Sequence, residues 1–466
     1  MAVPTKTLFF LRLFTSFPFA IFYSSMVLVV TAKFHLSPLN ATQTVGCFLG
    51  LNYALAVIGG YLAGKFVSYR MLFLLSILFQ FMGSAFFLAP NLNLAIGFAA
   101  IFLAGSLGST VSINLLLTQY FTPNDINRER AFFWNYSAMN IGYFLGYLCG
   151  GWLLYNTQNG EGIMFITSSM LAISVLMLLI QFTVLKDKST PYINLQKNNC
   201  RTHLLLTIFC LIFVSLVSFI SLKYAYLIND IILLIWVICI AFIVSMAIRH
   251  KHLTKSFLLF LVYYGCGVFF WSIYLLAPLA LILFLKHAVL LNVAGISIAP
   301  QWIQNINTFV VVFGTISTTT LLKKPYFQKH FSLPVFFAFS LVFMGLGFLM
   351  LYLGCCYLTH GKVAIEWVIL SYVLQSLGEI SIGPIGYALV GRIIPQKYHG
   401  IFSGFWILII GVAAIIASKI SQYLVPKDIY HHYIASFQNG FLTIIIVCLL
   451  IAIPLIICGK QLAKMS

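Results

Sequence analysis

Long apolar segments alternate with short polar ones along the whole chain. Leu, Ile, Phe and Val dominate fourteen of these segments, and each is long enough to cross about 30 Å of hydrocarbon as a helix. The pattern predicts membrane-spanning helices near residues 8–32, 43–64, 70–89, 94–121, 131–155, 162–185, 204–222, 228–248, 257–285, 302–322, 333–358, 364–391, 400–424 and 439–458. The expected fold class is therefore an all-α polytopic membrane protein.

A polar linker, residues 186–203, divides the spans into six, two and six. We expect an N-terminal six-helix bundle (1–185), a cytoplasmic linker with an inserted helical hairpin (186–255) and a C-terminal six-helix bundle (256–466). The hairpin is interpreted as a lipid-facing accessory. Two paired halves of this kind commonly enclose a binding site near the middle of the membrane.

Composition and charge agree with a membrane location. Of the 466 residues, 62% are hydrophobic and only 7% are charged, yet the net charge is +18. Placing Met1 in the cytoplasm puts twenty Lys and Arg, Arg12 among them, on the inner side and five outside, with Lys419 left within a span. We therefore expect a bacterial inner membrane protein with both termini cytoplasmic, a retained first helix and no nucleic-acid partner.

Other chemistries have little support in the sequence. The ten cysteines show no metal-ligand spacing and are interpreted as small packing residues. All ten histidines fall in loops or at the ends of spans, and the pair His431 and His432 is interpreted as solvated surface rather than a metal site. No phosphate-binding loop, nucleophile elbow or H-E-x-x-H pair is present. We expect no enzyme activity, no cofactor and no metal.

Glu379 stands out because it is the only one of the eight carboxylates that we place inside a long apolar segment. An ionisable side chain in a bilayer is costly unless it faces a partner, water or a cargo, so such a residue indicates a functional site.

Four segments resemble transporter motifs. Gly60, Gly64 and Arg70 are similar to the major facilitator motif between the second and third helices, although that family usually has Asp at the position of Gly64. Three others resemble the proton-coupled oligopeptide transporter (POT) branch of that superfamily. They are Phe132, Tyr136, Asn140 and Gly142 (F-x-x-x-Y-x-x-x-N-x-G), Trp302, Gln304 and Asn307 (W-F-Q-x-x-N), and Leu374, Gln375, Gly378, Glu379, Pro384 and Gly386 (L-Q-x-x-G-E-x-x-x-x-P-x-G).

The resemblance implies a major facilitator fold and a set of substrate-binding residues. In the family, the residues matching Asn140, Asn307 and Glu379 line the central cavity and hold the amino end of a peptide. A carboxylate balances an ammonium group, and amide oxygens accept its remaining hydrogens. The alternative for each asparagine is a hydrogen bond between helices.

Four aromatic residues complete the expected set. Tyr53 and Tyr23 match pocket tyrosines of the family's second and first helices, Tyr136 belongs to the fifth-helix motif, and Trp406 resembles a tryptophan near the cavity. Packing or a place at the membrane interface explains Tyr53 and Tyr23 equally well. Trp406 needs no function in a packed helix.

The chain also departs from the family. Ser16, Phe19 and Ala20 occupy the positions of the E-x-x-E-R cluster that is tied to proton coupling, Thr110 replaces the helix 4 lysine, and Leu275 stands where an acid is common. The pocket therefore keeps an anionic site but lacks basic residues for a carboxylate, which makes ordinary dipeptides and tripeptides doubtful cargo.

The sequence favours a monomeric transporter of a small peptide-like or amine-containing solute that works by alternating access. Glu379 either exchanges a proton for a cationic solute or serves facilitated diffusion without proton coupling. Two alternatives stay open: a major facilitator carrier for a siderophore or drug, and a membrane receptor or scaffold that has lost transport.

Overall fold

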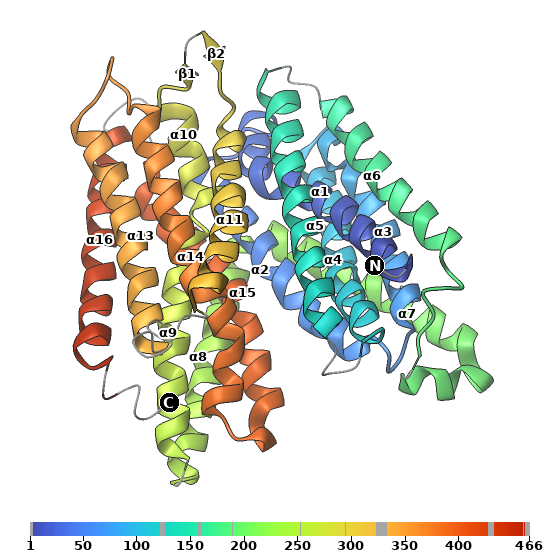
Figure 1. Cartoon of the computed structure of the whole chain (residues 1–466). Helices are drawn as coiled ribbons and strands as arrows, with labels where there is room; N and C mark the ends of the chain where they lie inside the picture. Colours follow the sequence, from blue (N-terminus) through green and yellow to red (C-terminus); the bar gives the residue numbers. More distant parts are fainter. Residues whose placement is uncertain are drawn as a thin grey trace. The chain divides into compact units, whose positions relative to one another are not determined.

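The computed structural model of the chain is built almost entirely of helices (Figure 1). It describes residues 3–121, 126–156, 160–188, 190–251, 253–293, 295–322, 333–426, 433–459 and 461. The α-helices are α1 (Val3–Ala32), α2 (Pro38–Leu62), α3 (Tyr69–Gly83), α4 (Leu92–Thr118), α5 (Ile126–Gly151), α6 (Gly160–Ile180), α7 (Pro191–Lys223), α8 (Ala225–Arg249), α9 (Thr254–Tyr274), α10 (Ile282–Ala288), α11 (Asn305–Leu322), α13 (Leu333–Cys356), α14 (Ile365–Ile393), α15 (His399–Leu424) and α16 (Tyr433–Ile457). Two short strands, β1 (Asn292–Val293) and β2 (Ile296–Ser297), form an antiparallel pair.

Twelve of the fourteen predicted spans coincide with candidate membrane-spanning helices. The other two, 131–155 and 302–322, overlap α5 and α11, which are not among the candidates found in the described residues. Within the described residues, twelve helices are long and apolar enough to cross a membrane. A helix satisfies its own backbone hydrogen bonds, which is why apolar segments of this length adopt it in lipid. The prediction of an all-α polytopic membrane protein is confirmed. The predicted linker is shorter than expected, because α7 already begins at Pro191.

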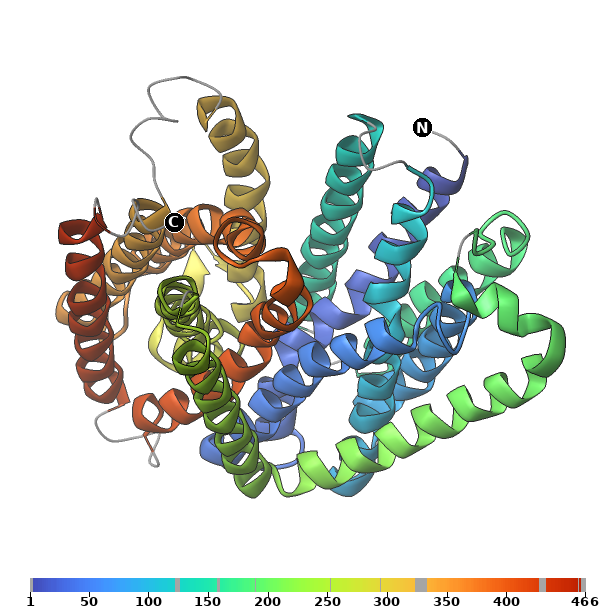
Figure 2. The ribbon, with the colours of Figure 1, turned by 90° about the horizontal axis from the view of Figure 1, so that it is seen from below.

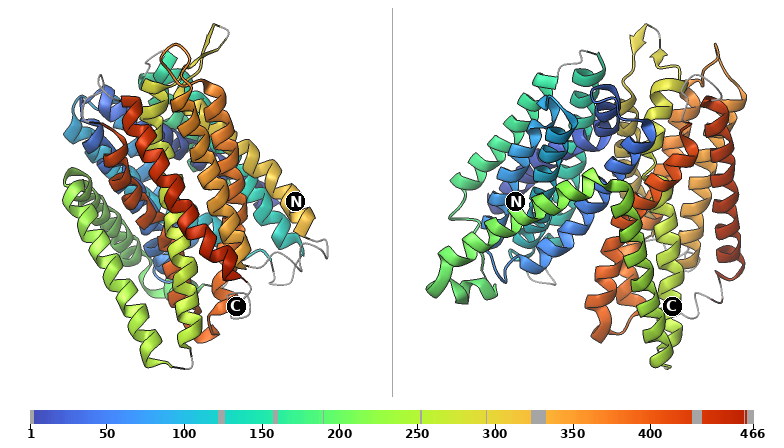
Figure 3. Two further views of the ribbon diagram at one scale, coloured as in Figure 1. Left: turned by 90° about the vertical axis from the view of Figure 1, so that its left-hand side faces the viewer. Right: turned by 180° about the vertical axis from the view of Figure 1, so that it is seen from behind.

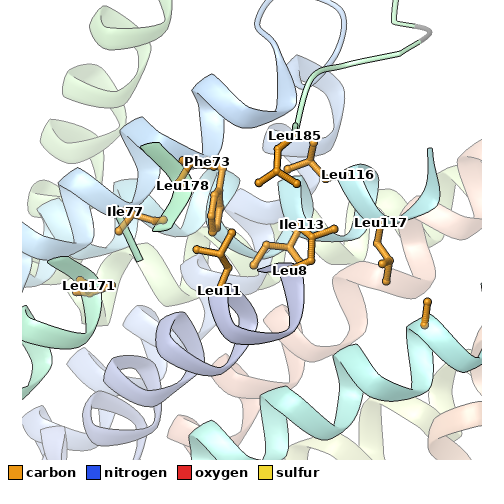
Figure 4. Close-up of a cluster of buried hydrophobic side chains, with 11 residues drawn as sticks. Leu8, Leu11, Phe73, Ile77, Ile113, Leu116, Leu117, Leu171, Leu178 and Leu185 are labelled. Carbon is orange, nitrogen blue, oxygen red and sulfur yellow. The ribbon is translucent and has the colours of Figure 1, made fainter. Parts of the chain in front are cut away.

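One compact unit, called unit 1 here, comprises Met1–Leu36 and Cys47–Ala225. In this unit α1 packs along α5, α3 packs along α4, and α7 runs past α4 (Figure 2). The close approach of α1 and α5 depends on glycine: a Cβ on Gly146 would lie 2.6 Å from the carbonyl oxygen of Phe17. A cluster of buried apolar side chains from α1, α3, α4 and α6 and the segment after α6 includes Leu8, Leu11, Phe73, Ile77, Ile113, Leu171, Leu178 and Leu185 (Figure 4).

The second compact unit, unit 2, comprises Ser37–Gly46 and Tyr226–Ser466. Here α13 packs along both α14 and α16 (Figure 3), and α9 packs against α13, α14 and α15. The three-helix contact of α9, α13 and α14 matters for function because α9 and α14 both carry residues of the candidate site.

Polar contacts join α8 to other parts of unit 2. Asp230 of α8 pairs with Lys419 of α15 at 2.6 Å, and Asn229 donates to the carbonyl oxygen of Gln43 at 3.3 Å. The expectation that Glu379 is the only carboxylate in a long apolar segment is therefore wrong, because Asp230 lies in the span at 228–248. Only its pairing with Lys419, 189 positions away along the chain, could not be read from the sequence.

Candidate functional site

Glu379 is the centre of a polar cluster formed by three helices of unit 2. The Asn307 side chain of α11 donates from Nδ2 to Oε2 of Glu379 at 2.7 Å, and Tyr274 at the end of α9 also hydrogen-bonds to this carboxylate. Hydrogen bonds to a carboxylate are charge-assisted and stronger than neutral ones. The structure thus brings together two of the residues predicted from sequence, Asn307 and Glu379, and adds Tyr274.

The local helix geometry orients the cluster. Ser376 lies three residues before Glu379 and therefore on the same face of α14. Its Oγ donates to the carbonyl oxygen of Tyr372 at 2.6 Å and accepts from Nδ2 of Asn307 at 3.0 Å. Both N–H groups of the Asn307 amide therefore donate, one to Ser376 and one to Glu379, and these two bonds fix the orientation of the side chain. Glu379 itself remains partly accessible, and a carboxylate has lone pairs left for a further donor.

Asn140 has a different environment in unit 1. Its side chain is buried and donates to the carbonyl oxygen of Tyr136, one turn earlier in α5, at 3.0 Å. A hydrogen bond between helices does occur nearby, from Nδ2 of Asn135 to Oδ1 of Asn114 at 3.0 Å. The asparagine that links α5 to α4 is therefore Asn135, and Asn140 bonds to its own helix.

Arg12 is the residue that sequence reasoning misplaced. We counted it among the inner-side charges, but it lies in the body of α1 with only 8% of its surface exposed. Its Nη2 donates to Sδ of Met139 at 2.9 Å, and Tyr53 and Tyr143 are close enough to interact with its charge. Its burial among the helices was not predicted from the sequence. The available signal was an arginine five positions inside a predicted span.

The aromatic residues of the predicted set divide between these environments. Tyr53 lies near Arg12, and Tyr136 of α5 is exposed. Tyr23 is buried, with ring contacts to Phe19 at 6.1 Å and Tyr147 at 6.3 Å.

Trp406 is also buried, within unit 2. Its ring lies 6.5 Å from that of Phe337 and would meet a Cβ on Gly267 at 3.3 Å. These contacts place Trp406 in the packing of α9, α13 and α15. The pair His431 and His432 lies outside the described residues.

Sequence comparison relates the chain to bacterial permeases. It is 26% identical to "Dipeptide and tripeptide permease A" of Yersinia pestis, with 95% of this chain and 89% of the relative covered. The protein of the same name from Serratia proteamaculans is 27% identical over 95% of this chain and 88% of the relative. No protein-family model matches the chain.

Comparison of folds leads to the same group. The peptide transporter POT, crystallised in complex with sulfate, is similar with a TM-score of 0.86 and 18% identity, covering 99% of this chain and 95% of that structure. A structure from work on proton dependent oligopeptide transporters gives a TM-score of 0.83 with 17% identity and covers 99% of both chains. The chain is thus similar in sequence, over nearly its whole length, to dipeptide and tripeptide permeases and in fold to POT transporters, as the resemblance of its motifs predicts.

Proposed function

We propose that the protein is a membrane transporter, not an enzyme, and moves small peptides or peptide-like amines by alternating access. The observation that carries the proposal is the Glu379 cluster, in which Asn307 and Tyr274 hold a carboxylate within the α-helical body of unit 2. An ionisable side chain within a membrane-spanning helix indicates a functional site, and a cation is the ligand that a carboxylate attracts. The relatives named dipeptide and tripeptide permease support a peptide as the source of that cation.

The chemistry of the cluster favours an ammonium group. Asn307 uses both of its N–H groups on Ser376 and Glu379, so its Oδ1 is the atom left to accept a hydrogen bond. The carboxylate of Glu379 and this amide oxygen both accept, and an ammonium group offers three donors and no acceptor. The free amino end of a peptide satisfies this set, whereas a purely anionic chelator does not.

Glu379 also serves as the proton carrier in this proposal. A carboxyl group that binds either a proton or an ammonium group couples the movement of the two, because one must leave before the other binds. Ser16, Phe19 and Ala20 occupy the positions of the family's acid cluster on the first helix, so no second carboxylate is available there. The membrane is the bacterial inner membrane, with both termini in the cytoplasm.

The experiment compares Glu379→Gln with Glu366→Gln in the purified full-length protein. Glu366 lies on the same helix, α14, but is exposed in its first turn, so it is a matched control. We expect Glu379→Gln to weaken binding of L-alanyl-L-alanine by at least about tenfold, because the ammonium group of the peptide loses the carboxylate that balances its charge. Glu366→Gln should leave the binding unchanged.

The outcome also separates the alternatives. Equal affinity of both variants for the dipeptide would contradict the assignment of Glu379 as the residue that binds the amino group of the solute. Binding of hydroxycarboxylate chelators in place of dipeptides would support the siderophore carrier. Binding without flux in reconstituted vesicles would support the receptor or scaffold. Proton movement is measured in the same vesicles with an internal pH dye: dipeptide flux without a pH change would mean facilitated diffusion.

A further inference from the structure

Three basic side chains gather at one end of unit 2, where α10 ends and α14 begins. Lys286 and His287 belong to the last turn of α10, and Lys362 lies in the connection between α13 and α14. Both lysines are close enough to His287 to interact with its charge. No carboxylate of the described residues forms a salt bridge with any of the three. This basic cluster therefore carries positive charge that the described part of the chain does not balance.

The main chain holds the basic cluster together. The N–H of Val363 donates to the carbonyl oxygen of Ala288 at 2.9 Å, and the N–H of Leu290 donates to the carbonyl oxygen of Val363 at 2.9 Å. These bonds fix the connection that carries Lys362 beside the end of α10, although Lys362 and His287 are 75 positions apart in the sequence. The cluster is therefore built by the fold and not by one run of basic residues.

Two further groups beside the basic cluster can donate hydrogen bonds. The ring of Tyr433, the first residue of α16, lies 5.7 Å from the ring of His287. Only 8% of Tyr433 is exposed, and its hydroxyl is buried without a partner among the described residues. A buried polar group normally has a partner, so this hydroxyl indicates a ligand. The N-cap residue of α14, Ala364, makes no side-chain hydrogen bond, and the N-terminus of a helix attracts anions.

These groups suit a phosphate. A lysine ammonium group offers three donors, and an imidazole and a phenol can each donate one hydrogen bond. Phosphate oxygens accept several such bonds at once, and bonds between a cation and an anion are shorter and stronger than neutral ones. A cationic ligand, by contrast, would be repelled by both lysines.

Aromatic residues indicate the depth of the basic cluster in the membrane. Tyr357, directly after α13, is 67% exposed, and its ring lies 6.4 Å from that of Trp367, in the first turn of α14, in a stacked arrangement. Tyrosine and tryptophan are enriched at the level of the lipid headgroups. Lys362 lies between these two aromatic residues along the chain. In the orientation proposed above, with both termini in the cytoplasm, this level belongs to the outer leaflet.

We propose that the basic cluster, together with the hydroxyl of Tyr433, binds the phosphate group of an anionic phospholipid in the outer leaflet. The lysines select a lipid with net negative charge over one whose headgroup also carries a cation. The proposal does not depend on the identity of the transported solute. Free phosphate in solution is the other source of the same chemistry.

The test measures binding of dioctanoyl phosphatidylglycerol to the purified full-length protein by native mass spectrometry. Lys286→Gln and Lys362→Gln each remove one positive charge from the basic cluster. Lys223→Gln is the matched control, because Lys223 is an exposed lysine at the end of α7 with the rings of Phe219 and Tyr224 nearby. We expect each cluster variant to raise the dissociation constant of the tightest-bound lipid by at least about fivefold and the control to leave it unchanged.

Tyr433→Phe separates a hydroxyl that binds the lipid from one that is only buried. We expect this variant to weaken binding of phosphatidylglycerol by about threefold, because one donor to the phosphate is lost. An unchanged affinity, together with a higher unfolding temperature of the lipid-free protein, would overturn the role assigned to the hydroxyl.

Two results would overturn the proposal as a whole. One is equal affinity of Lys286→Gln, Lys362→Gln and the Lys223→Gln control for phosphatidylglycerol. The other is equal affinity of the wild type for phosphatidylglycerol and dioctanoyl phosphatidylcholine. If sodium phosphate then raises the unfolding temperature of the wild type but not of Lys286→Gln, the site takes a free anion and the lipid assignment is wrong. Lys362 is exposed, so Lys362→Gln tests the site even if Lys286→Gln does not fold.

Discussion

Each of the two units contains a charged residue within a membrane-spanning helix, and the two residues have very different hydrogen-bond partners. Glu379 in unit 2 accepts from Asn307 at 2.7 Å and from Tyr274, and Ser376 fixes the orientation of Asn307. Arg12 in unit 1 donates to a methionine sulfur and lies near two phenols. The anion has strong partners within its own unit, whereas the cation has weak ones.

This difference indicates what each charge needs from outside. A carboxylate surrounded by donors is tolerable on its own and gains further from a cation. A buried guanidinium group without an acceptor of opposite charge is costly. Ligand-free protein should therefore be strained at Arg12 and relaxed at Glu379, a contrast that can be measured.

The largest expected effect has opposite signs at the two residues. Arg12→Met removes an unpaired charge and replaces the arginine with an unbranched apolar side chain, so it should stabilise the ligand-free protein by about 1–4 kcal/mol. Glu379→Leu leaves the donors of Asn307 and Tyr274 without their acceptor and should destabilise it by about 1–3 kcal/mol. Thermal unfolding in detergent, followed by intrinsic fluorescence, gives both shifts. A lower unfolding temperature for Arg12→Met would mean that Arg12 is already satisfied within the protein.

The second prediction concerns the contact of α1 and α5, which brings Met139 to Arg12. Gly146→Ala places a Cβ 2.6 Å from the Phe17 carbonyl oxygen, so the helices must separate, and we expect a loss of about 1–3 kcal/mol. Gly150→Ala is the matched control, because its Cβ would meet side chains of Ser25 and Ile21 at 3.4 Å and beyond, in ordinary contact. Equal unfolding temperatures for the two variants would show that this close approach is unimportant.

A smaller effect is expected at the ion pair of Asp230 and Lys419. The two side chains are 48% and 24% exposed, so solvent and headgroups screen the charges, and the coupling should be only about 0.2–1 kcal/mol. Lys419→Met should cost more than Asp230→Asn, since Lys419 also lies 4.6 Å from the centre of the Tyr226 ring. A double-mutant cycle on thermal stability measures the coupling energy of the pair. A value of zero would show that the pair does not stabilise the packing of α8 in unit 2.

The smallest effect extends the comparison to a carboxylate outside the spans. Asp187 accepts from the backbone N–H of Tyr69, at the start of α3, at 3.1 Å and from Thr190 at 3.3 Å. Burial raises the pKa of Asp187 above its ordinary value, and the hydrogen bonds from Tyr69 and Thr190 oppose that rise only in part.

The sign of the pH effect follows from that raised pKa. The folded protein binds a proton at Asp187 more readily than the unfolded chain, so this group's contribution to stability grows as the pH falls toward the raised pKa. The difference in unfolding temperature between the wild type and Asp187→Asn should therefore change in favour of the wild type as the pH is lowered from about 7 to about 5. A difference that stays constant with pH would contradict the effect of burial.

The sequence was most informative about the residues of unit 2. Asn307 and Glu379 are 72 positions apart, yet two separate motifs place them in one site, and the structure joins them by a hydrogen bond. Tyr274 and Ser376 were missed, because a tyrosine near a helix end and a serine in an apolar run are common and carry no signal of their own. In unit 1 the sequence identified Tyr53 but not the cation beside it.

The length and composition of the apolar segments alone determined that this chain is a bundle of membrane-spanning helices, because lipid leaves an apolar segment few other ways to satisfy its backbone. Only the tertiary structure decided the environment of each charge. Arg12 and Lys419 look alike in sequence, as single cations in apolar spans, but one lies against Met139 and the other against Asp230. Those partners come from distant parts of the chain, and packing of the helices determines which of them meet.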